Sequence, residues 1–468
     1  MADRRPVFRK AFRVRLFNPA VVAGAILAAA TGAASPALAE PVQAKPAGAF
    51  VDSVGIVGPF GEAKGAYAEN YEALKDAIRE LGIRYYRTSA ATPRAAKVAQ
   101  DFSTSLGMKG IFHLSEWDGS KQNGVRLGSA AGIIDGLTAG GTAGIFAIEG
   151  PNELNQNGPS DWAKQLREYQ SEIYTHVKSQ PRLQNVLVVG PSLVTNAERP
   201  RPSETLGGLQ DRIDLGNMHD YIADGGAVES RFRQSAAMLR ANNFGPVPLM
   251  ITETGTCTEW KLVKARTPSQ KCVSEKAQAK YLPRSLLDKF DENPKNKAFI
   301  FELINRAPPA RAESAGGGDG WWGWGLLDSD MHRKPGFYAV RNLIELLNDP
   351  GGEFAAGTLD YRLKGAGDRV QQVLLQKRNG SFYLILWQPV RSFDKDDNAD
   401  LDPAEVPLTL TLALARPANV SVYRPTPING TDPATALKPV QTLAGASSVE
   451  LQVPDHVLVV QIAPAKES

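Results

Sequence analysis

Eight short apolar runs, each followed by a longer amphipathic segment, occupy the chain from Phe50 to about Leu347. The runs are rich in β-branched residues and have the length of buried strands, while the segments between them repeat apolar residues at helical spacing. Strands that alternate with helices in this way build a parallel sheet covered by helices. A count of eight favours closure into a (β/α)8 TIM barrel over an open sheet.

The eight apolar runs and the segments between them give the predicted strands and helices. The strands are Val54–Gly58, Ile83–Thr88, Lys109–Ser115, Ile145–Glu149, Asn185–Gly190, Asp214–His219, Pro248–Thr252 and Ala298–Leu303. The helices are Tyr67–Leu81, Arg94–Leu106, Asp161–Ser179, Glu229–Asn242, Ser274–Phe290 and Pro335–Leu347. Gly82 and Gly107 follow two of these helices directly, where glycine commonly ends a helix in the left-handed conformation.

A Pro/Gly-rich stretch at residues 348–352 ends the helical pattern. Beyond it, short stretches alternate apolar and polar residues and are separated by turns such as Asn379-Gly380, which is typical of antiparallel strands. The predicted strands there are Gln372–Gln376, Phe382–Trp387, Leu408–Ala413, Val420–Tyr423, Val449–Val453 and Val457–Ile462. We expect a barrel domain over residues 40–349 and a small C-terminal β-sandwich domain over residues 350–468.

The first 39 residues have the pattern of an export signal. Six basic side chains precede an apolar run from Val21 to Ala34, and Ala37-Leu38-Ala39 offers small residues for cleavage. Because the run is short for a membrane span, the pattern favours cleavage after Ala39 over a retained anchor. We expect a periplasmic or secreted protein with no stable membrane anchor. The Arg4-Arg5 pair leaves the twin-arginine route open.

The charge balance gives no indication of a nucleic-acid partner. The chain has 53 basic and 50 acidic residues, but residues 1–39 contain six of the basic and one of the acidic ones. The remainder therefore carries a formal net charge of about −2, which is typical of a mixed, solvated surface. We expect a monomer that binds no nucleic acid.

Only two cysteines are present, Cys257 and Cys272. In an exported chain, an even pair separated by 15 positions favours a disulfide over a metal site or a catalytic thiol. Motifs for metal or nucleotide binding are absent from the sequence, as is the Gly-x-Ser-x-Gly elbow of serine hydrolases. We therefore expect neither a cofactor nor a metal ion.

Two glutamates stand where predicted strands end on the same side of the barrel. The fourth strand runs into Gly150-Pro151-Asn152-Glu153, and the seventh into Glu253. Strands 4 and 7 of an eight-stranded barrel face one another across the opening, and active sites lie at the C-terminal ends. Two carboxyl groups about 5 Å apart suit retaining glycoside cleavage. A single such Glu is commonly just solvated, but the pair with its preceding Asn favours catalysis.

This pattern resembles the clan A glycoside hydrolases, which have Asn-Glu after strand 4 and a nucleophilic Glu after strand 7. The resemblance covers residues 50–347 or so, and with the C-terminal β-domain it is greatest for family 39 and its bacterial exopolysaccharide-cleaving relatives. It implies a retaining hydrolase of β-linked polysaccharide or oligosaccharide. It further implies that Glu153 is the general acid/base, Glu253 the nucleophile, and Asn152 the donor to the sugar 2-hydroxyl.

Other polar side chains follow predicted strands at the same end. Arg87, after strand 2, is suited to keep Glu253 ionised, as the clan's arginine does, or it is a structural residue of the rim. His219 and Tyr221 follow strand 6, where the clan has a His or Tyr that contacts the nucleophile or substrate. His219 also fits a buried core histidine, and the role of Tyr221 stays open.

Aromatic residues in two loops are candidates for a sugar subsite. His113 and Trp117 follow strand 3, where Trp117 equally fits loop packing, and the neighbouring Glu116 is expected to be solvated. The loop after strand 8 places Trp321, Trp322 and Trp324 among glycines, as a sugar platform with Trp324 in the site or as packing between the domains. The family tends to put one aromatic residue directly at the end of strand 8. This chain has Glu302-Leu303 there, which leaves the sugar undetermined.

Two alternatives to hydrolysis stay open. A transglycosylase would use the same two carboxylates with a sugar acceptor in place of water. A non-catalytic glycan-binding matrix protein would keep the barrel without the chemistry. The presence of both Glu153 and Glu253 favours an enzyme.

Overall fold

The computed structural model describes residues 41–118, 124–194, 202–222, 228–258, 272–306, 323–394, 396–401, 407–428 and 430–464. The predicted export segment at residues 1–39 lies outside these ranges and stays a prediction. Among the described residues, no helix combines the length and the apolar character that a bilayer-spanning segment needs.

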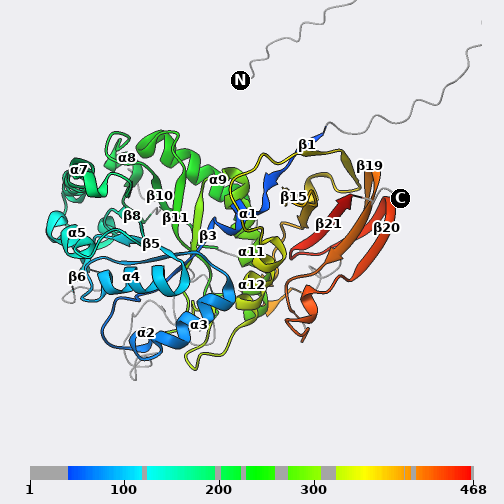
Figure 1. The fold of residues 1–468 in the computed structure, drawn as a ribbon, viewed down its shortest axis with the longest axis horizontal. Coiled ribbons are helices and arrows are strands. Elements are labelled where there is room, and N and C mark those ends of the chain that lie inside the picture. The colour runs from blue at the N-terminus through cyan, green and yellow to red at the C-terminus, as the bar shows by residue number, and fades with distance from the viewer. Residues whose placement is uncertain are drawn as a thin grey trace, which may run out of the picture. The chain divides into compact units, whose positions relative to one another are not determined.

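A ring of eight parallel strands forms the first part of the fold (Figure 1). The strands are β3 (Val54–Val57), β4 (Tyr85–Ser89), β5 (Lys109–His113), β8 (Ile145–Glu149), β9 (Leu187–Val189), β10 (Gly216–His219), β11 (Leu249–Thr254) and β12 (Lys297–Ile300). Hydrogen bonds connect them in the order β10-β11-β12-β3-β4-β5-β8-β9. A parallel bridge between Val189 and Leu215, at β9 and β10, closes the ring. The predicted (β/α)8 barrel is confirmed, and every predicted strand overlaps an observed one.

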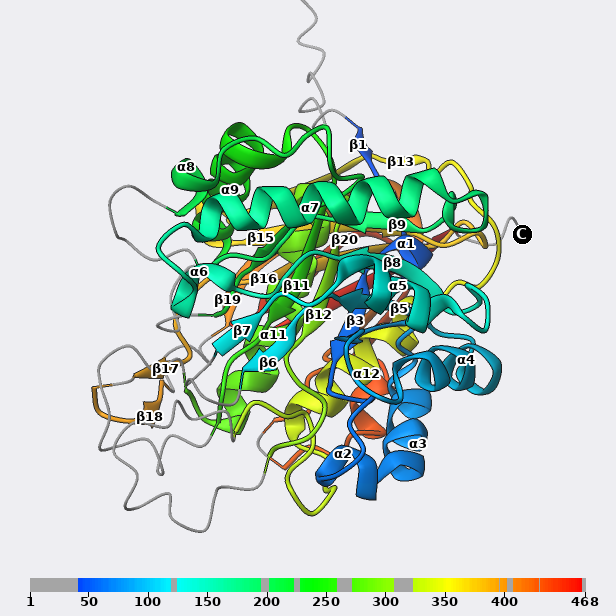
Figure 2. The same cartoon turned by 90° about the vertical axis from the view of Figure 1, so that its left-hand side faces the viewer.

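Helices cover the outside of the ring, as α5 and α7 do beside β8 and β9 in Figure 2. They are α2 (Ala66–Glu69), α3 (Tyr71–Leu81), α4 (Ala95–Leu106), α5 (Ala130–Thr138), α6 (Leu154–Asn157), α7 (Trp162–Ser179), α8 (Pro202–Leu206), α9 (Val228–Leu239), α11 (Glu275–Glu292) and α12 (Pro335–Leu347). Gly82 and Gly107 end α3 and α4 with φ of 73° and 66°. Helix α5 was not predicted, because Gly132 and Gly136 weaken its helical propensity.

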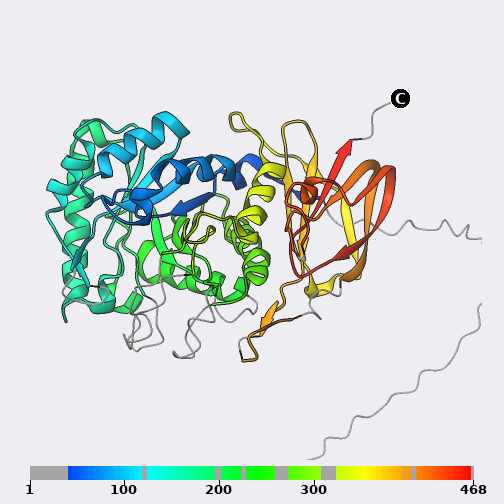
Figure 3. The same cartoon turned by 90° about the horizontal axis from the view of Figure 1, so that it is seen from below.

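The C-terminal part is a β-sandwich domain, as predicted (Figure 3). Its strands are β13 (Thr358–Leu359), β14 (Tyr361–Lys364), β15 (Gln371–Gln376), β16 (Phe382–Trp387), β17 (Phe393–Asp394), β18 (Ala399–Asp400), β19 (Leu408–Tyr423), β20 (Gln441–Val453) and β21 (Leu458–Pro464). Alternate residues of β16, β19 and β21 are buried together in one apolar cluster. Two predicted strands prove to be halves of β19, whose pairing shifts register between Ala413 and Ala418.

The N-terminal segment of the described chain joins the C-terminal strands. The strand β1 (Val42–Gln43) pairs with β13, and β2 (Lys45–Pro46) lies parallel to β15, where Lys45 pairs with Leu375. Helix α1 (Ala47–Val51) then leads into the first barrel strand. The sequence pattern did not predict these pairings, because a two-residue strand is too short to show periodicity.

Helix α11 connects the barrel to the C-terminal part through buried polar contacts. Nζ of Lys280 lies 2.9 Å from a carboxylate oxygen of Asp455, and both side chains are at most 1% exposed. Nη1 of Arg284 donates to the backbone oxygens of Asp455 and Val390, each at 3.0 Å. These contacts hold α11 against the C-terminal part, on the side of the helix away from the barrel.

Candidate active site

The two predicted catalytic glutamates lie within or just after two strands of the ring that are separated by β9 and β10. Glu253 lies within β11, and Glu153 follows β8 by four residues. The backbone of Glu153 has φ 48° and ψ 38°, the left-handed region that non-glycine residues rarely adopt. Its N–H donates to the backbone oxygen of Ser192 at 3.1 Å, which holds this turn in place. Strained backbone of this kind is often found at functional sites.

The two carboxyl groups converge around His219, at the end of β10. Nδ1 of His219 lies 2.7 Å from Oε1 of Glu153 and 3.4 Å from Oε2 of Glu253. One oxygen of each glutamate and one ring nitrogen of His219 all lie within 4.8 Å of one another. The predicted convergence of strands 4 and 7 therefore brings the two glutamates close enough to contact one small group.

Arg87, on β4, lies beneath this pair and is 2% exposed. Its Nε and Nη2 donate to the two carboxylate oxygens of Glu149, both at 2.7 Å. Its Nη1 donates to Oε1 of Glu253 at 2.8 Å, and Nη2 also donates to Oδ1 of Asn152 at 2.8 Å. Although burial disfavours the charged guanidinium, Glu149 and then Glu253 raise the pKa of Arg87. Arg87 therefore supplies a permanent positive charge to Glu253.

Glu149 is a buried carboxylate that was not predicted as a site residue. Burial raises its pKa, but the Arg87 guanidinium outweighs burial and holds the pKa below its ordinary value. Nδ2 of Asn217 donates to it at 3.0 Å, and Oγ1 of Thr252 donates to Oδ1 of Asn217 at 2.7 Å. A carboxylate inside an otherwise apolar strand is the signal that identifies such a residue, because a buried charge needs a partner.

Tyr221 also contacts Glu253, through its hydroxyl group, which donates to Oε2. Burial, followed by the charges of Glu253 and Glu153, raises the pKa of Tyr221 far above its ordinary value. Tyr221 is therefore a neutral hydrogen-bond donor at any physiological pH. The two oxygens of Glu253 thus accept from two different donors, Arg87 and Tyr221.

The two predicted site histidines have opposite electrostatic environments. Burial opposes the charged form of His219, but Glu253 and Glu153 together raise its pKa. Burial and then Arg87 lower the pKa of His113 to about 3, so His113 is neutral. Nδ1 of His113 is buried and has no hydrogen-bond partner among the described residues. The pairing of β5 with β8 places His113 next to Glu149, at the end of the barrel where Glu153 and Glu253 lie.

An aromatic wall flanks Tyr221. The rings of Tyr221 and Trp324 meet edge to face, with centroids 4.9 Å apart, and Phe301 lies 6.1 Å from Tyr221 and 5.9 Å from Trp324. The predicted end of strand 8 was wrong: β12 ends at Ile300, so Phe301 is the aromatic residue that directly follows the strand. Trp324 reaches this wall, whereas Trp321 and Trp322 lie outside the described residues.

The structure describes only part of the loop that follows β5, the third strand of the barrel. Trp117 belongs to the short strand β6 (Glu116–Asp118), which pairs with β7 (Gly124–Arg126), and its side chain lies outside what the structure describes. Its predicted role in a sugar subsite stays a prediction. Glu116 is not freely solvated as expected, because its carboxylate pairs with Arg126 and its side chain is 31% exposed.

The predicted disulfide between Cys257 and Cys272 is present. The residue after Cys257, Thr258, donates its N–H to the backbone oxygen of Gly323 at 2.9 Å. Nζ of Lys334 donates to Oγ1 of Thr258 at 2.9 Å. The bridge therefore anchors the backbone next to Thr258, which is hydrogen-bonded to the segment carrying Trp324.

Within the part of the chain that the structure describes, two groups of side chains have ligand atoms close enough for a metal ion. The first is Glu153, His219 and Glu253 themselves, and the second is Asp328, Asp330 and His332 near α12. In the first group Arg87 already brings a positive charge to Glu253, which opposes a second cation there. In the second group Asp330 and His332 are exposed, and exposed acidic groups of this kind are usually just solvated.

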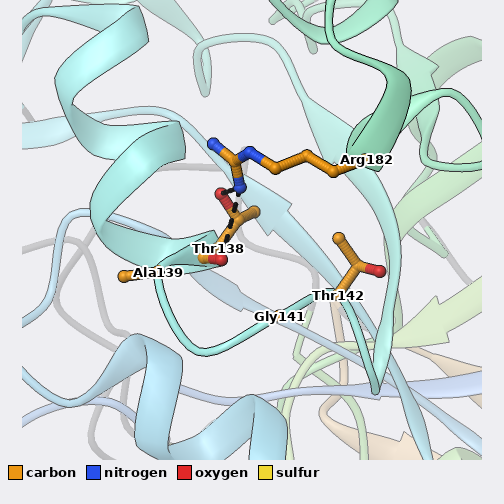
Figure 4. A pocket seen from close by; sticks show the side chains of 5 residues that line it. All are labelled: Thr138, Ala139, Gly141, Thr142 and Arg182. Carbon is orange, nitrogen blue, oxygen red and sulfur yellow. Dashed lines mark hydrogen bonds between the residues drawn. The ribbon is translucent and has the colours of Figure 1, made fainter.

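A hollow of about 350 Å³ lies at the other end of the barrel (Figure 4). Thr138, Ala139, Gly141, Thr142 and Arg182 line it. Thr142 precedes β8, whereas Glu153 follows it, so the hollow and the glutamates are at opposite ends of that strand. The Arg182 guanidinium donates to Oγ1 of Thr138 at 2.6 Å and to Asp135 at 2.7 Å. Arg182 is therefore already engaged within the protein, and we assign no chemistry to this hollow.

Comparison with solved structures places the fold among known barrels. A monomeric β-xylosidase from Caulobacter crescentus CB15 matches with a TM-score of 0.55 at 16% identity, over 90% of this chain and 98% of that one. The GH39 enzyme from Xanthomonas axonopodis pv. citri has a TM-score of 0.55 at 15% identity, over 90% and 96%. A glucosidase from Croceicoccus marinus has a TM-score of 0.55 at 13% identity, over 91% and 97%. No protein-family model and no curated protein sequence matches the chain. At these identities the likeness shows a shared barrel and β-domain.

Proposed function

We propose that this protein is a retaining glycoside hydrolase that cleaves β-linked polysaccharide or oligosaccharide. The observation that carries the proposal is the convergence of Glu153, His219 and Glu253 within 4.8 Å. Retaining enzymes separate their two carboxyl groups by about 5–5.5 Å, whereas inverting enzymes need about 6.5–9.5 Å to admit a water molecule. The spacing supports direct attack by one carboxylate. The shared fold with a β-xylosidase and a GH39 enzyme points in the same direction.

The surroundings of the two glutamates support different roles for them. A nucleophile has to be ionised, and Glu253 accepts from the permanent cation of Arg87 and from the Tyr221 hydroxyl. Glu153 contacts the ring nitrogen of His219, a titratable imidazole whose pKa Glu253 and Glu153 raise. We therefore assign Glu253 as the nucleophile and Glu153 as the general acid/base.

The reaction then has two steps. A carboxylate oxygen of Glu253 attacks the anomeric carbon while the carboxyl proton of Glu153 passes to the leaving glycosidic oxygen. The bond to the leaving sugar breaks, and an ester between the sugar and Glu253 forms. The Glu153 carboxylate next takes a proton from water, whose oxygen attacks the anomeric carbon and releases Glu253. Each step inverts that carbon once, so the configuration is retained.

Other side chains are suited to bind the sugar. Asn152 is held by Arg87 beside Glu153, which suits a contact to the sugar 2-hydroxyl. His113 offers a neutral imidazole, and Trp324 with Phe301 offers an aromatic surface of the kind that stacks on the CH face of a pyranose. We propose a monomer that acts outside the cytoplasm, which the disulfide supports because such bonds persist in oxidising compartments.

The test replaces each glutamate in the full chain. A panel of aryl β-glycosides and bacterial exopolysaccharides first identifies a substrate from the reducing ends that it releases. Glu253→Gln is then expected to abolish turnover with the fold intact, by circular dichroism and melting temperature. Glu116→Gln is the matched control, because this carboxylate follows strand 3 at the same end and is paired with Arg126. Full turnover by Glu253→Gln would overturn the assignment.

Added azide separates the two roles. In Glu253→Gly, azide fills the space of the lost nucleophile and gives a glycosyl azide of inverted configuration. In Glu153→Gly, azide attacks the glycosyl ester and gives a product of retained configuration. The opposite stereochemistry, read by proton NMR, would exchange the two roles. Products with an added sugar at high acceptor concentration would instead support transglycosylation.

A further inference from the structure

His219 and Tyr221 are two residues apart and both contact the proposed catalytic glutamates. Between them, Asp220 donates its backbone N–H to the backbone oxygen of Glu253 at 3.0 Å, so this segment continues alongside β11. Side chains in extended chain point alternately to opposite faces. Because the side chains of His219 and Tyr221 point into the site, the Asp220 side chain points to the opposite face of this segment, away from the site.

On this face, the buried Lys289 ammonium lies against the Asp220 carboxylate. Nζ of Lys289, on α11, lies 2.7 Å from Oδ2 of Asp220, and the two side chains are 1% and 8% exposed. Nζ of Lys289 also donates to Oγ of Ser285 at 2.8 Å and lies 4.8 Å from the centre of the Phe232 ring. A buried ion pair contributes little net stability, because taking both charges out of water costs about as much as their attraction returns. Its main effect is on the position of the groups it joins.

The same helix carries a second buried lysine on its other side. Lys280 precedes Lys289 by nine positions, which is about two and a half turns of an α-helix. Lys280 therefore faces the C-terminal part, where it pairs with Asp455, while Lys289 faces the barrel. Figure 2 shows α11 beside β12, the strand that neighbours β11. The two ion pairs resemble each other chemically, but only one lies behind the site.

We propose that Lys289 is a positioning residue: by holding Asp220 from behind, it sets His219 against Glu153 and Tyr221 against Glu253. The proposal rests on the proposed function, because it concerns the same two glutamates. It adds that a cation on α11, outside the ring of strands, balances the charge of Asp220 behind the site. Lys289 touches neither the substrate nor the reacting atoms.

Loss of the Lys289 ammonium has a definite electrostatic consequence. The Asp220 carboxylate would stay buried without its counter-charge, next to His219. A negative charge nearby makes an imidazole hold its proton more strongly. The charged and titratable groups around His219 include Glu153, Glu253, Tyr221, Arg87, His113 and Glu149 in the site, and Asp220 behind it. Of these, only Asp220 changes its partner in Lys289→Met.

The first test needs no substrate. Labelling the full chain with 15N-histidine gives signals from five imidazole rings, and His219→Gln identifies those of His219. In Lys289→Met the titration of His219 is expected to move to higher pH by about one unit. Adding Asp220→Asn to that variant removes the unpaired charge and is expected to return the titration towards that of the wild type. An unchanged His219 titration in Lys289→Met overturns the proposal.

The second test uses the substrate found in the panel. In Lys289→Met, kcat is expected to fall about tenfold with a smaller change in KM, and the acidic limb of the pH profile to move to higher pH. Lys280→Met is the matched control, since it breaks an equally buried pair on the same helix. It is expected to lower the melting temperature and to leave the pH profile in place.

The outcomes separate the two proposals. A wild-type protein that cleaves nothing in the panel contradicts the proposed function, while the NMR titration still decides whether Lys289 sets the state of His219. A wild type that is active, with Lys289→Met altered only in melting temperature, makes Lys289 a purely structural residue. If Lys289→Met does not fold, the double variant with Asp220→Asn carries the kinetic reading alone, because its His219 titration is expected to lie near that of the wild type. Wild-type kcat in the double variant then contradicts the proposal.

Discussion

Nη1 of Arg87 donates to Oε1 of Glu253 at 2.8 Å, in an ion pair whose side chains are 2% and 8% exposed. The other two nitrogens of the same guanidinium are occupied by both oxygens of Glu149. Glu149 fixes the plane of the guanidinium, so Nη1 has a fixed direction towards Glu253. The cation is therefore a rigid part of the site.

Arg87→Lys tests this rigidity. Lysine keeps the charge but lacks the planar fork that spans Glu149 and Glu253 at once, and it leaves a buried carboxylate short of donors. We expect kcat/KM to fall about 100-fold, which corresponds to about 3 kcal/mol. Initial rates at neutral pH measure the effect. Arg79→Lys is the control, because Arg79 forms an exposed pair with Asp76 on α3, and an equal loss there would mean that the effect is not local.

Tyr221→Phe removes the hydroxyl that donates to Glu253 and keeps the ring that packs against Trp324. A hydrogen bond to a charged group contributes about 1.5–3 kcal/mol. We expect kcat to fall by roughly 10- to 100-fold with little change in KM, because the ring that flanks the substrate stays in place. Steady-state kinetics measure both constants. A change confined to KM would make Tyr221 a binding residue without influence on Glu253.

The raised pKa of His219 predicts how stability depends on pH. Burial opposes protonation, but Glu253 and Glu153 raise the pKa above its ordinary value of 6.5. A group with a raised pKa in the folded state contributes stability that is fully present below the unfolded pKa. That stability is lost as the pH rises through the folded pKa. We therefore expect the melting temperature of His219→Gln to lie furthest below the wild type at acidic pH.

Melting curves from about pH 5.5 to pH 9 measure this gap, which should narrow as the pH rises through the range in which His219 loses its proton. His332→Gln is the control, since the His332 side chain is 78% exposed. Its melting temperature should follow the wild type throughout. A gap for His219→Gln that widens towards alkaline pH would contradict the prediction.

Removal of the disulfide is expected to affect both stability and substrate binding. The bridge closes a loop of 15 positions, and chain entropy assigns such a loop about 3 kcal/mol. Replacing Cys257 and Cys272 by Ser should lower the melting temperature. It should also raise KM, because Thr258 then loses its anchor beside the segment that carries Trp324. A reducing agent should reproduce both effects in the wild type and have none in the double variant.

The sequence predicted the parts of the fold that follow from local pattern. Strand spacing identified the barrel, and barrel geometry then brought Glu153 and Glu253 together, because strands 4 and 7 face each other. Glu149 escaped notice, since its partner Arg87 lies 62 positions earlier and only the closed ring joins them. Phe301 was missed because the predicted strand included it and extended to Leu303, whereas β12 ends at Ile300. The break at Arg416-Pro417 similarly divided β19 in two.

The pairing of Lys45 with Leu375 has a consequence for how the chain is made. Synthesis runs from the N-terminus, and domains generally fold as they emerge. The backbone groups of β2 stay unpaired until β15 has been synthesised. Because the barrel lies between β2 and β15 in the sequence, the two strands that flank it pair only after the whole barrel has been made. A product truncated after α12 lacks β15 altogether. Its β2 backbone would then be unpaired when it meets the quality-control machinery of the cell.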